Sequence, residues 1–349
     1  MKKYKHYYLT SESVTEGHPD KVCDFISDSI LDACLEQDKE SRVAVETFIS
    51  KDKVVVAGQI TSNAKINIEN IVRERLKEVG YTDSSINMDY RTCRVDINIT
   101  KQSNDIAIGV NDGGAGDQGI MFGYATDESE DYMPYPISVA HKLSKRLAEV
   151  RKNGEMPYLK SDGKVQVTVE YVNDAPIRID TILISAQHSA DTDIHTLQKD
   201  ILAKVVFEVV EPDMVDIETK FYINPTGRFV VGGAVADTGL TGRKIIVDTY
   251  GGIARHGGGA FSGKDGTKVD RSASYMLRHI AKNIVANGLA RRCEIQLSYG
   301  IGLREPLSIY IDCFGTNRMP ESIIIQAIKT VNNGVLESPI PLKIAPITL

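Results

Sequence analysis

The chain has 349 residues, of which 42% are hydrophobic and 25% are charged, and its formal net charge is −6. This length predicts two or three packed modules, and the ordinary globular composition excludes disordered and fibrous proteins. The acidic balance disfavours nucleic acid as a partner, because a surface that holds a phosphate backbone is normally basic.

The sequence indicates neither a membrane segment nor an export signal. No apolar run approaches the roughly 20 residues that a membrane helix needs, and the basic residues 1–5 have no apolar stretch behind them. The cysteines form no Cys-x-x-Cys pair and are typical of free thiols in a reducing cytoplasm. They are Cys23, Cys34, Cys93, Cys293 and Cys313. We therefore expect a cytoplasmic protein that does not bind a membrane.

The first third of the chain predicts a helix, two strands and a second helix, followed by another strand. Apolar residues recur at helical spacing over 19–37, where a proline suits the first turn. Strand-like runs follow at 42–50 and 54–62, and residues 68–79 again have one apolar face before a glycine stop signal. Alternating apolar and polar residues predict a further strand at 93–99.

The order of helix, two strands and helix recurs in the middle and in the last third. The predicted ranges are 138–152, 165–171, 177–184 and 194–209, and then 271–287, 294–299, 307–314 and 321–331. Each copy has strand faces that must be buried against its helices or against another copy. The pattern predicts an α/β (α+β) fold of three structurally similar domains, each a mixed sheet plus helices, at residues 1–101, 112–230 and 231–349.

The segment 17–21, Gly-His-Pro-Asp-Lys, begins the first predicted helix. A helix N-terminus presents free N–H groups and the positive end of the helix dipole, which favour phosphate. His18 and Lys21 add hydrogen-bond donors. Asp20 could cap the helix or hold a divalent metal that bridges phosphates. A plain capped helix is the alternative interpretation.

The glycine-rich segment 257–265 resembles a P-loop without matching it. It contains Gly258-x4-Gly263-Lys264, but Asp265 occupies the position where serine or threonine would coordinate magnesium, and no strand directly precedes the glycines. Such a loop can still bring its backbone close to phosphates. A flexible surface loop is the alternative, but the charged residues at 268–271 favour an anion and metal site.

Three further segments are polar where packing alone does not require it. Residues 237–244 place an arginine and a lysine side by side on a tight turn, which leads into a predicted strand at 245–247. Residues 101–119 are rich in glycine, as in a lid or a linker. Residues 224–229 end in an arginine that could reach an anion and a phenylalanine that could stack on a base. Solvated surface, a disordered linker and an ordinary turn are the respective alternatives.

Together these segments supply many cations and a few carboxylates. The cations are His18, Lys21, Lys164, Arg228, Arg243, Lys244, Lys264 and Lys268, and the carboxylates are Asp20, Asp117, Asp237 and Asp270. This set suits a polyphosphate held by basic side chains and magnesium. No Ser-His-Asp hydrolase motif, zinc motif or dinucleotide fingerprint is evident.

Three of these motifs carry a family resemblance. Residues 9–21, 114–119 and 257–265 resemble the hallmark segments of the S-adenosylmethionine synthetases, and the similarity extends from about residue 9 to about residue 330. The resemblance implies three similar α/β domains about a pseudo-threefold axis. It also implies a methionine adenosyltransferase, in which the methionine sulfur attacks C5′ of ATP and the expelled triphosphate is hydrolysed to pyrophosphate and phosphate. The neutral sulfur needs no general base, whereas the leaving group needs preorganised cations and metal.

The same resemblance implies roles for individual residues. Residues with an expected catalytic role are His18, Lys164, Arg243 and Lys264. The expected ATP contacts are His18, Asp162, Lys164, Arg228, Phe229, Asp237, Arg243, Lys244, Ala260 and Lys264. Expected at the methionine end are Gln59, Gln102, Asp117, Asp237 and Lys268. Asp20 and Asp270 are expected to bind two Mg²⁺ ions, and Glu46 is expected to bind K⁺. A homodimer or homotetramer with active sites at the subunit interface is also implied.

The chain departs from the family pattern at three places. Gln59 replaces a glutamate expected to meet the methionine ammonium, and a lost charge-assisted bond costs about 1 kcal/mol or more. The loop after residue 103 is shorter than usual and has Asn104 where proline is common. The end after about residue 333 is atypical and shortened, as in a truncation or a frame change, so reduced stability and activity are expected.

Two other functions remain open at this point. One is a catalytically impaired or silent partner subunit in a methionine adenosyltransferase oligomer, which Gln59 and the atypical end favour. The other is a P-loop phosphotransferase, against which Asp265 and the missing strand count.

Overall fold

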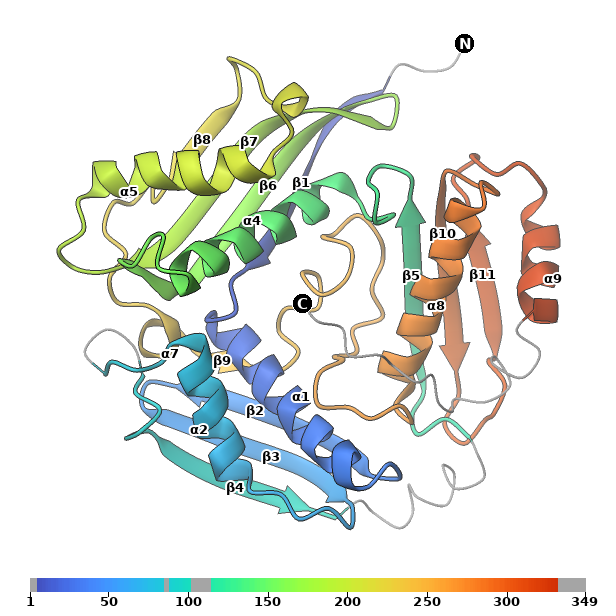
Figure 1. The fold of residues 1–349 in the computed structure, drawn as a ribbon. Coiled ribbons are helices and arrows are strands. Elements are labelled where there is room, and N and C mark those ends of the chain that lie inside the picture. The colour runs from blue at the N-terminus through green and yellow to red at the C-terminus, as the bar shows by residue number, and fades with distance from the viewer. Residues whose placement is uncertain (1–4, 85–87, 102–113, 332–349) are drawn as a thin grey trace.

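The computed structural model describes residues 5–84, 88–101 and 114–331. Three units of helix, two antiparallel strands and helix follow one another along the chain (Figure 1). The first unit consists of α1 (Pro19–Gln37), β2 (Arg42–Ser50), β3 (Lys53–Thr61) and α2 (Ile68–Val79). The third consists of α8 (Val269–Ala286), β10 (Arg292–Tyr299), β11 (Ser308–Asp312) and α9 (Glu321–Val331).

The second unit has the same order with a longer sheet and an interrupted second helix. It consists of α4 (Tyr135–Lys152), β6 (Leu159–Val172), β7 (Ala175–His188) and the helical run α5 (Ile194–Ile201), η1 (Leu202–Val206) and α6 (Phe207–Val209). The turn η1 is a π-helix, and the 3₁₀ turn η2 (Pro212–Met214) follows α6. The three predicted helix–strand–strand–helix copies are thus confirmed, with ends shifted by a few residues.

Two units continue into a further strand that lies parallel to the second strand of their pair. β4 (Arg94–Thr100) runs parallel to β3, and β8 (Lys220–Ile223) runs parallel to β7. Among the described residues the third sheet has the order β11-β10-β5, without a corresponding parallel strand. Two of the three sheets are therefore mixed, and the third is antiparallel throughout its described strands.

Each sheet also receives one strand that precedes a different unit in the sequence. β1 (His6–Val14) pairs with β6 of the second unit, and β5 (Gly119–Thr126) pairs with β10 of the third. β9 (Gly239–Leu240) pairs with β2 of the first unit. All three pairings are antiparallel, and each adds to the first strand of its unit. This cyclic exchange agrees with the pseudo-threefold relation of the units that the family resemblance implies.

Each unit buries its helices against one face of its own sheet. In α1, Val22, Ile26 and Ile30 are fully buried and lie on one side of the helix, because they are four residues apart. They pack in one hydrophobic cluster with Val43 and Val45 of β2, which alternate with less buried neighbours. Equivalent clusters form beneath α4 and beneath α8. The described helices therefore cover one face of each sheet, and we call the opposite face the outer face.

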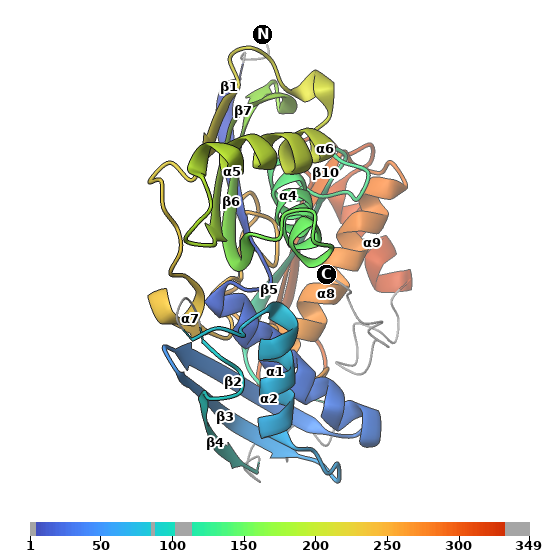
Figure 2. The same ribbon diagram turned by 60° about the vertical axis from the view of Figure 1, so that its left-hand side comes forward.

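A long segment without regular helix or strand, residues 241–268, runs between the three units (Figures 1 and 2). We call it the central segment. Ser11 Oγ in β1 donates to the carbonyl of Gly251 at 2.8 Å. The N–H of Arg255 donates to Glu294 of β10 at 2.9 Å. The short helix α7 (Gly233–Ala236) and β9 lead into it. Contacts with strands of two sheets fix its course.

The predicted strand at 245–247 is wrong, because these residues form a turn of the central segment. The N–H of Asp248 donates to the carbonyl of Lys244 at 2.9 Å, a bond across four residues that an extended strand cannot make. The β propensity of these residues does not determine their structure, because Asp248 is held by an ion pair with Lys21 of α1.

Within the described residues no helix is both long and apolar enough to cross a membrane.

Candidate active site

The N-terminus of α1 brings the first group of predicted site residues together. The ring Nδ1 of His18 caps the helix by accepting a hydrogen bond from the N–H of Asp20 at 3.2 Å. Asp20 is therefore not the cap, contrary to one of the two roles considered for it. Its carboxylate accepts from the N–H of Leu240 at 2.9 Å and from Lys244 Nζ at 2.6 Å. Burial opposes ionisation of Asp20, but these bonds lower its pKa below the usual value.

His18 is buried beneath this group and is surrounded by charges. Burial lowers the pKa of His18 to about 3, and the ammonium groups of Lys244 and Lys164 act in the same direction. The imidazole is therefore neutral at neutral pH. Because Nδ1 accepts a hydrogen bond, the proton is assigned to Nε2, which is free to act as a donor. Lys164 reaches the group from β6, directly opposite Val14 of β1.

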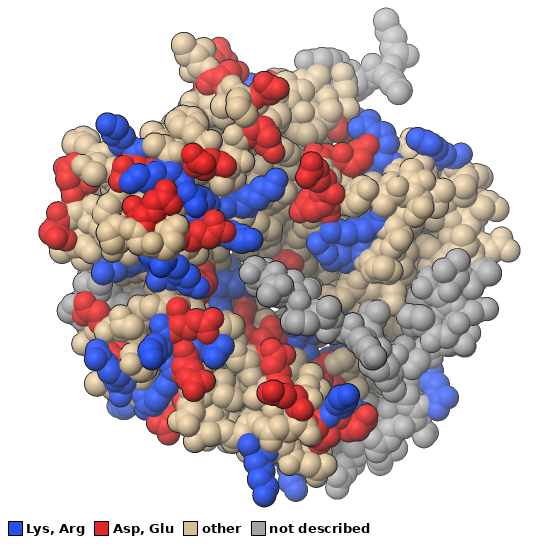
Figure 3. All heavy atoms as spheres, viewed as in Figure 1, with Lys and Arg blue, Asp and Glu red and all other residues tan. Residues whose placement is uncertain are grey.

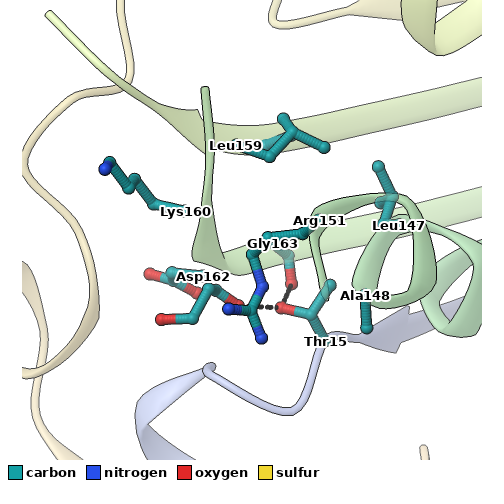
Figure 4. A pocket seen from close by; sticks show the side chains of 10 residues that line it. Thr15, Leu147, Ala148, Arg151, Leu159, Lys160, Asp162 and Gly163 are labelled. Carbon is teal, nitrogen blue, oxygen red and sulfur yellow. Dashed lines mark hydrogen bonds between the residues drawn. The ribbon is translucent and has the colours of Figure 1, made fainter. Parts of the chain in front are cut away.

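Asp162 lies at the irregular start of β6, where the register with β7 shifts. Its carboxylate accepts from the N–H of Gly233 at 2.8 Å, and burial raises its pKa to about 6. A small pocket opens beside it between β6 and α4, with Thr15 and Arg151 on its walls (Figure 4). The buried hydroxyl of Ser161, also in this wall, has no hydrogen-bond partner within the described parts of the chain.

A second group lies where the central segment meets α8. Lys264 Nζ pairs with Asp270 at 2.8 Å, and Lys268 Nζ pairs with the buried Asp265 at 2.5 Å. Gly259 is pressed against Asp270, because a Cβ added there would stand 2.2 Å from Cγ of the aspartate. The absence of a side chain at this glycine thus lets the loop approach the carboxylate closely.

The two groups meet at the contact between Gly242 and Ala260. A Cβ added to Gly242 would lie 2.3 Å from the Cβ of Ala260, and Gly242 has a positive φ of 77°. The turn that carries Arg243 and Lys244 therefore lies against the glycine-rich loop that carries Lys264. Arg243 also lies 3.7 Å from the Asp20 carboxylate, although half of its side chain remains exposed.

Comparison with known proteins identifies the family. The N-terminal, central and C-terminal domain models of the S-adenosylmethionine synthetases match residues 6–104, 112–229 and 231–338. The chain belongs to the S-adenosylmethionine synthetase family. It is 57% identical over 323 residues to the S-adenosylmethionine synthase of Desulfosudis oleivorans, an alignment covering 90% of this chain and 83% of that protein. It is 54% identical to the synthase of Finegoldia magna and 55% to that of Clostridium botulinum, with 93% of this chain and 86% of each relative covered.

The remaining residues that the family resemblance predicts lie at more open positions. Arg228, Asp117 and Asp237 are exposed, and Phe229 is half-buried, with its N–H donating to His188 Nε2 at 3.0 Å. Gly233, four residues after Phe229 in the chain, donates its N–H to the Asp162 carboxylate. Gln102 and the atypical end after residue 333 lie outside the described residues.

Glu46 and Gln59 lie on the outer face of the first sheet. Glu46 is opposite Ala57 and Gln59 is opposite Ala44 in the β2–β3 pair, so both side chains point to the same side. Glu46 is exposed, whereas Val45 and Thr47 point into the core. The backbone of Lys264 forms a bridge with Ala44. The second group of site residues is thus next to this outer face, at the edge of β2.

The carboxylates suit a divalent metal that binds few protein ligands. Asp20 and Asp270 offer hard oxygen donors, each already within 3 Å of a lysine ammonium of the site. Within the described ranges no three His, Cys, Asp or Glu side chains are grouped closely enough to form an all-protein metal cage. Magnesium bound with nucleotide needs only one or two carboxylates, because phosphates and water complete its shell. The donor set therefore fits Mg²⁺.

Sequence reasoning missed the roles of Lys21 and Asp265. Lys21 does not point to a phosphate site as a free donor, because its Nζ is held by Asp24 at 3.2 Å and by Asp248. Asp265 was recognised only as a mismatch to the P-loop. Its carboxylate accepts from the N–H of Val43 at 2.6 Å and from Thr267, and so ties the loop to β2. The Asp-x-Thr spacing is a local turn signal that could have indicated this anchoring.

Charged side chains of both signs are interspersed over the face viewed in Figure 3. The same alternation holds inside the candidate site, where the lysines at 244, 264 and 268 each pair with an aspartate. Opposite charges thus neutralise one another locally. Such a site favours a compact anion that arrives with its own metal, because the anion and the metal can replace both partners of each pair.

Proposed function

We propose that this chain transfers the adenosyl group of ATP to the sulfur of L-methionine and then hydrolyses the bound triphosphate to pyrophosphate and phosphate. The observation that carries the proposal is that Arg243, Lys244 and Lys264 stand on two touching turns of the central segment, while the ammonium of Lys164 helps to lower the pKa of His18 beside them. The transfer is the one for which the relatives of this chain are named. Neither the described part of the structure nor the named relatives add support for the silent-partner alternative.

The arrangement suits a reaction whose difficulty is the leaving group. A thioether sulfur is a neutral nucleophile at pH 7 and needs no base, whereas triphosphate leaves C5′ with several negative charges. Fixed cations that face this developing charge lower the barrier without reorganising during the reaction. His18 contributes a neutral Nε2 donor at the same place, because its lowered pKa keeps the ring uncharged. In this proposal Asp162, Arg228, Phe229, Asp237 and Ala260 hold the nucleotide.

Magnesium and potassium are the expected cofactors. Two Mg²⁺ ions, held by Asp20 and Asp270, would neutralise phosphate charge when bound, and Glu46 would hold K⁺. The lysines that now pair with the two aspartates would then pair with phosphate oxygens. The methionine end is assigned to Gln59, Gln102, Asp117, Asp237 and Lys268. Gln59 supplies a hydrogen bond without charge.

A second copy of the chain completes the site in this proposal. Glu46 and Gln59 lie on the outer face of the first sheet, beside Phe48, whose side chain is 39% exposed. An exposed aromatic ring beside polar site residues is typical of a surface that a partner covers. We therefore propose a homodimer or homotetramer in the cytoplasm with active sites at the subunit interface. Light scattering behind a sizing column gives the mass, and a monomer at micromolar concentration contradicts this assembly.

The test of the reaction is product formation by purified protein with ATP, Mg²⁺, K⁺ and methionine. Chromatography resolves S-adenosylmethionine, pyrophosphate and phosphate. We expect all three in equal amounts, and none of them when methionine is omitted. ATP consumption that continues without methionine contradicts the proposal. Folded oligomer that forms no product supports the silent-partner alternative.

A further inference from the structure

Three aspartates on one face of α1 each hold a different part of the region that carries the site cations. Asp20, Asp24 and Asp28 are four residues apart, so they form one stripe along the helix. We call this stripe the acidic ladder. Asp20 accepts from the N–H of Leu240, Asp24 from that of Gly242 and Asp28 from that of Gly263. Asp24 and Asp28, unlike Asp20, have no role in the proposed chemistry itself.

Asp24 holds the turn that carries Arg243 and Lys244. Its Oδ1 accepts from the N–H of Gly242 at 2.8 Å, directly before the two cations. Its Oδ2 accepts from Lys21 Nζ at 3.2 Å, and Lys21 also pairs with Asp248 at the far end of the turn. Asp24 therefore fixes one end of the turn directly and the other through Lys21. The carboxylate is only 4% exposed, so water competes little for these bonds.

Asp28 holds the glycine-rich loop on both sides of Lys264. Its Oδ1 accepts from the N–H of Gly263 at 2.9 Å and from Arg271 Nη1 at 2.8 Å. The same Nη1 also donates to the carbonyl of Lys264 at 3.1 Å. The backbone before and after the Lys264 Cα is thus fixed by one carboxylate–guanidinium pair. Gly263 has a φ of 76°, so the bond also stabilises a backbone conformation that few residues adopt.

We infer that Asp24 and Asp28 are positioning residues for the triphosphate site, Asp24 for Arg243 and Lys244 and Asp28 for Lys264. The inference rests on the proposed function, because it assumes that these cations face the triphosphate. Cations that must meet a developing charge have to be held in place before the reaction, since a small misplacement weakens their effect strongly. The acidic ladder thus holds these cations in fixed positions relative to α1 of the first unit, although they follow α1 by more than 200 residues in the sequence.

The test compares Asp24→Asn, Asp28→Asn and Asp28→Ala with the matched control Asp32→Asn in the full chain. Asp32 is the next aspartate of the same stripe and is exposed. It interacts with Asp28 and Arg271 only through its charge, so Asp32→Asn removes a nearby charge without removing a bond to the loops. Calorimetry measures the affinity for imidotriphosphate, an analogue of triphosphate that resists hydrolysis, in the presence of Mg²⁺. Circular dichroism confirms at the same temperature that each variant is folded.

We expect Asp28→Ala to weaken imidotriphosphate binding at least tenfold, and the two asparagine variants to weaken it less. An amide oxygen still accepts the backbone bond but no longer pairs with Arg271 or Lys21. The kcat should fall in the same order while the KM for methionine changes less than twofold. If Asp28→Ala does not fold, the asparagine variants carry the test.

Binding within twofold of the unaltered protein in folded Asp24→Asn and Asp28→Asn overturns the inference, as does an equal loss in Asp32→Asn. Failure of the unaltered protein to bind imidotriphosphate also overturns it. If the unaltered protein binds the analogue but makes no S-adenosylmethionine, the proposed function fails. The ranking of the variants in analogue binding still tests whether Asp24 and Asp28 position the cations. The two failures are therefore distinguishable.

Discussion

Lys264 connects the glycine-rich loop to the proposed chemistry, because its ammonium pairs with Asp270, an expected Mg²⁺ ligand. We expect Lys264→Ala to lower kcat at least about 100-fold, the size of loss seen when one preorganised group that stabilises transition-state charge is removed. The fold should persist, because the side chain is partly exposed and Arg271 still holds the loop backbone.

The measurement is the rate of S-adenosylmethionine formation, with thermal unfolding as the check on the fold. Lys39→Ala, at an exposed position after α1, is the control and should leave the rate unchanged. An unchanged rate in Lys264→Ala itself would remove the proposed role of this loop.

His141 makes the stability of the protein sensitive to acid. It lies on α4, its ring Nδ1 is 2.9 Å from Ser13 Oγ, and burial lowers its pKa to about 4. Between pH 6.5 and pH 4 the unfolded chain binds a proton at this position that the folded protein does not bind. The folded state therefore loses stability as the pH falls through this window, by on the order of 3 kcal/mol for this one group.

We expect His141→Gln to reduce the loss of stability between pH 7 and pH 4.5, because glutamine keeps a polar atom near Ser13 but does not titrate. Urea unfolding at both pH values gives the free energy of unfolding. His195→Gln, at an exposed position on α5, is the control. An identical pH dependence in His141→Gln and in the unaltered protein contradicts this account.

Single residues were predictable from the sequence where a motif names them, but their pairings were not. His18, Asp20 and Lys264 stand in motifs, so their presence at a phosphate site could be predicted. The pairing of Asp20 with Lys244 depends on β9 reaching the first sheet, a contact across 224 residues that no local pattern encodes. For the same reason the sequence could not indicate that Lys21 is held between Asp24 and Asp248.

Among the secondary-structure elements, β9 is short and depends on close packing. A Cβ added to Gly239 would lie 2.2 Å from the carbonyl oxygen of Pro19 and 2.7 Å from Ile49 Cγ2. We expect Gly239→Ala to destabilise the protein by about 1–3 kcal/mol, the usual cost of overpacking, because backbone atoms cannot yield as a flexible side chain can. Activity should fall as well, since Leu240 of β9 bonds to Asp20.

Gly266→Ala is the matched control, because nothing lies within 4 Å of a Cβ added there. Denaturant unfolding measures both variants. Equal stability of the two alanine variants would show that β9 is free to move away from α1.

Elements with a clear period were predicted well, and elements set by distant contacts were not. α1 was predicted at its observed ends because proline opens it and apolar residues recur every four positions. β9 has two residues and exists only because β2 offers its edge. At 245–247, β-branched residues suggested a strand, but the ion pair of Asp248 with Lys21 favours a turn. Tertiary contacts decide such short segments.

At the scale of the whole molecule, the cyclic exchange of strands makes the units depend on one another. The predicted middle domain, residues 112–230, contains β6, but the neighbouring β1 comes from residues before α1. We expect a fragment of residues 112–230 to be poorly soluble, because nine paired residues of β6 would become an open edge. Adding a peptide of residues 5–15 should restore a folded fragment.

Circular dichroism and light scattering measure folding and aggregation of the fragment with and without the peptide. A peptide with the same composition in scrambled order is the control. A fragment that is folded and monomeric without any peptide contradicts the expected dependence.

The three-unit architecture could be predicted because the order of helix, two strands and helix repeats in the sequence. The exchange could not, since β1, β5 and β9 have no local feature that names their partner sheet. The domain boundaries at 1–101, 112–230 and 231–349 stay predictions. They describe the units along the chain, whereas the sheets combine strands from different parts of it.

The strand exchange also has a consequence for synthesis, which proceeds from the first residue to the last. β1 leaves the ribosome long before its partner β6, and the sheet of the first unit receives β9 only after residue 240 has been added. β5 waits in the same way for β10, which begins at Arg292. Open strand edges are prone to pair with other chains. A nascent chain that stalls before β10 has been added exposes the open edge of β5, and a chaperone that covers strand edges is most needed at this stage.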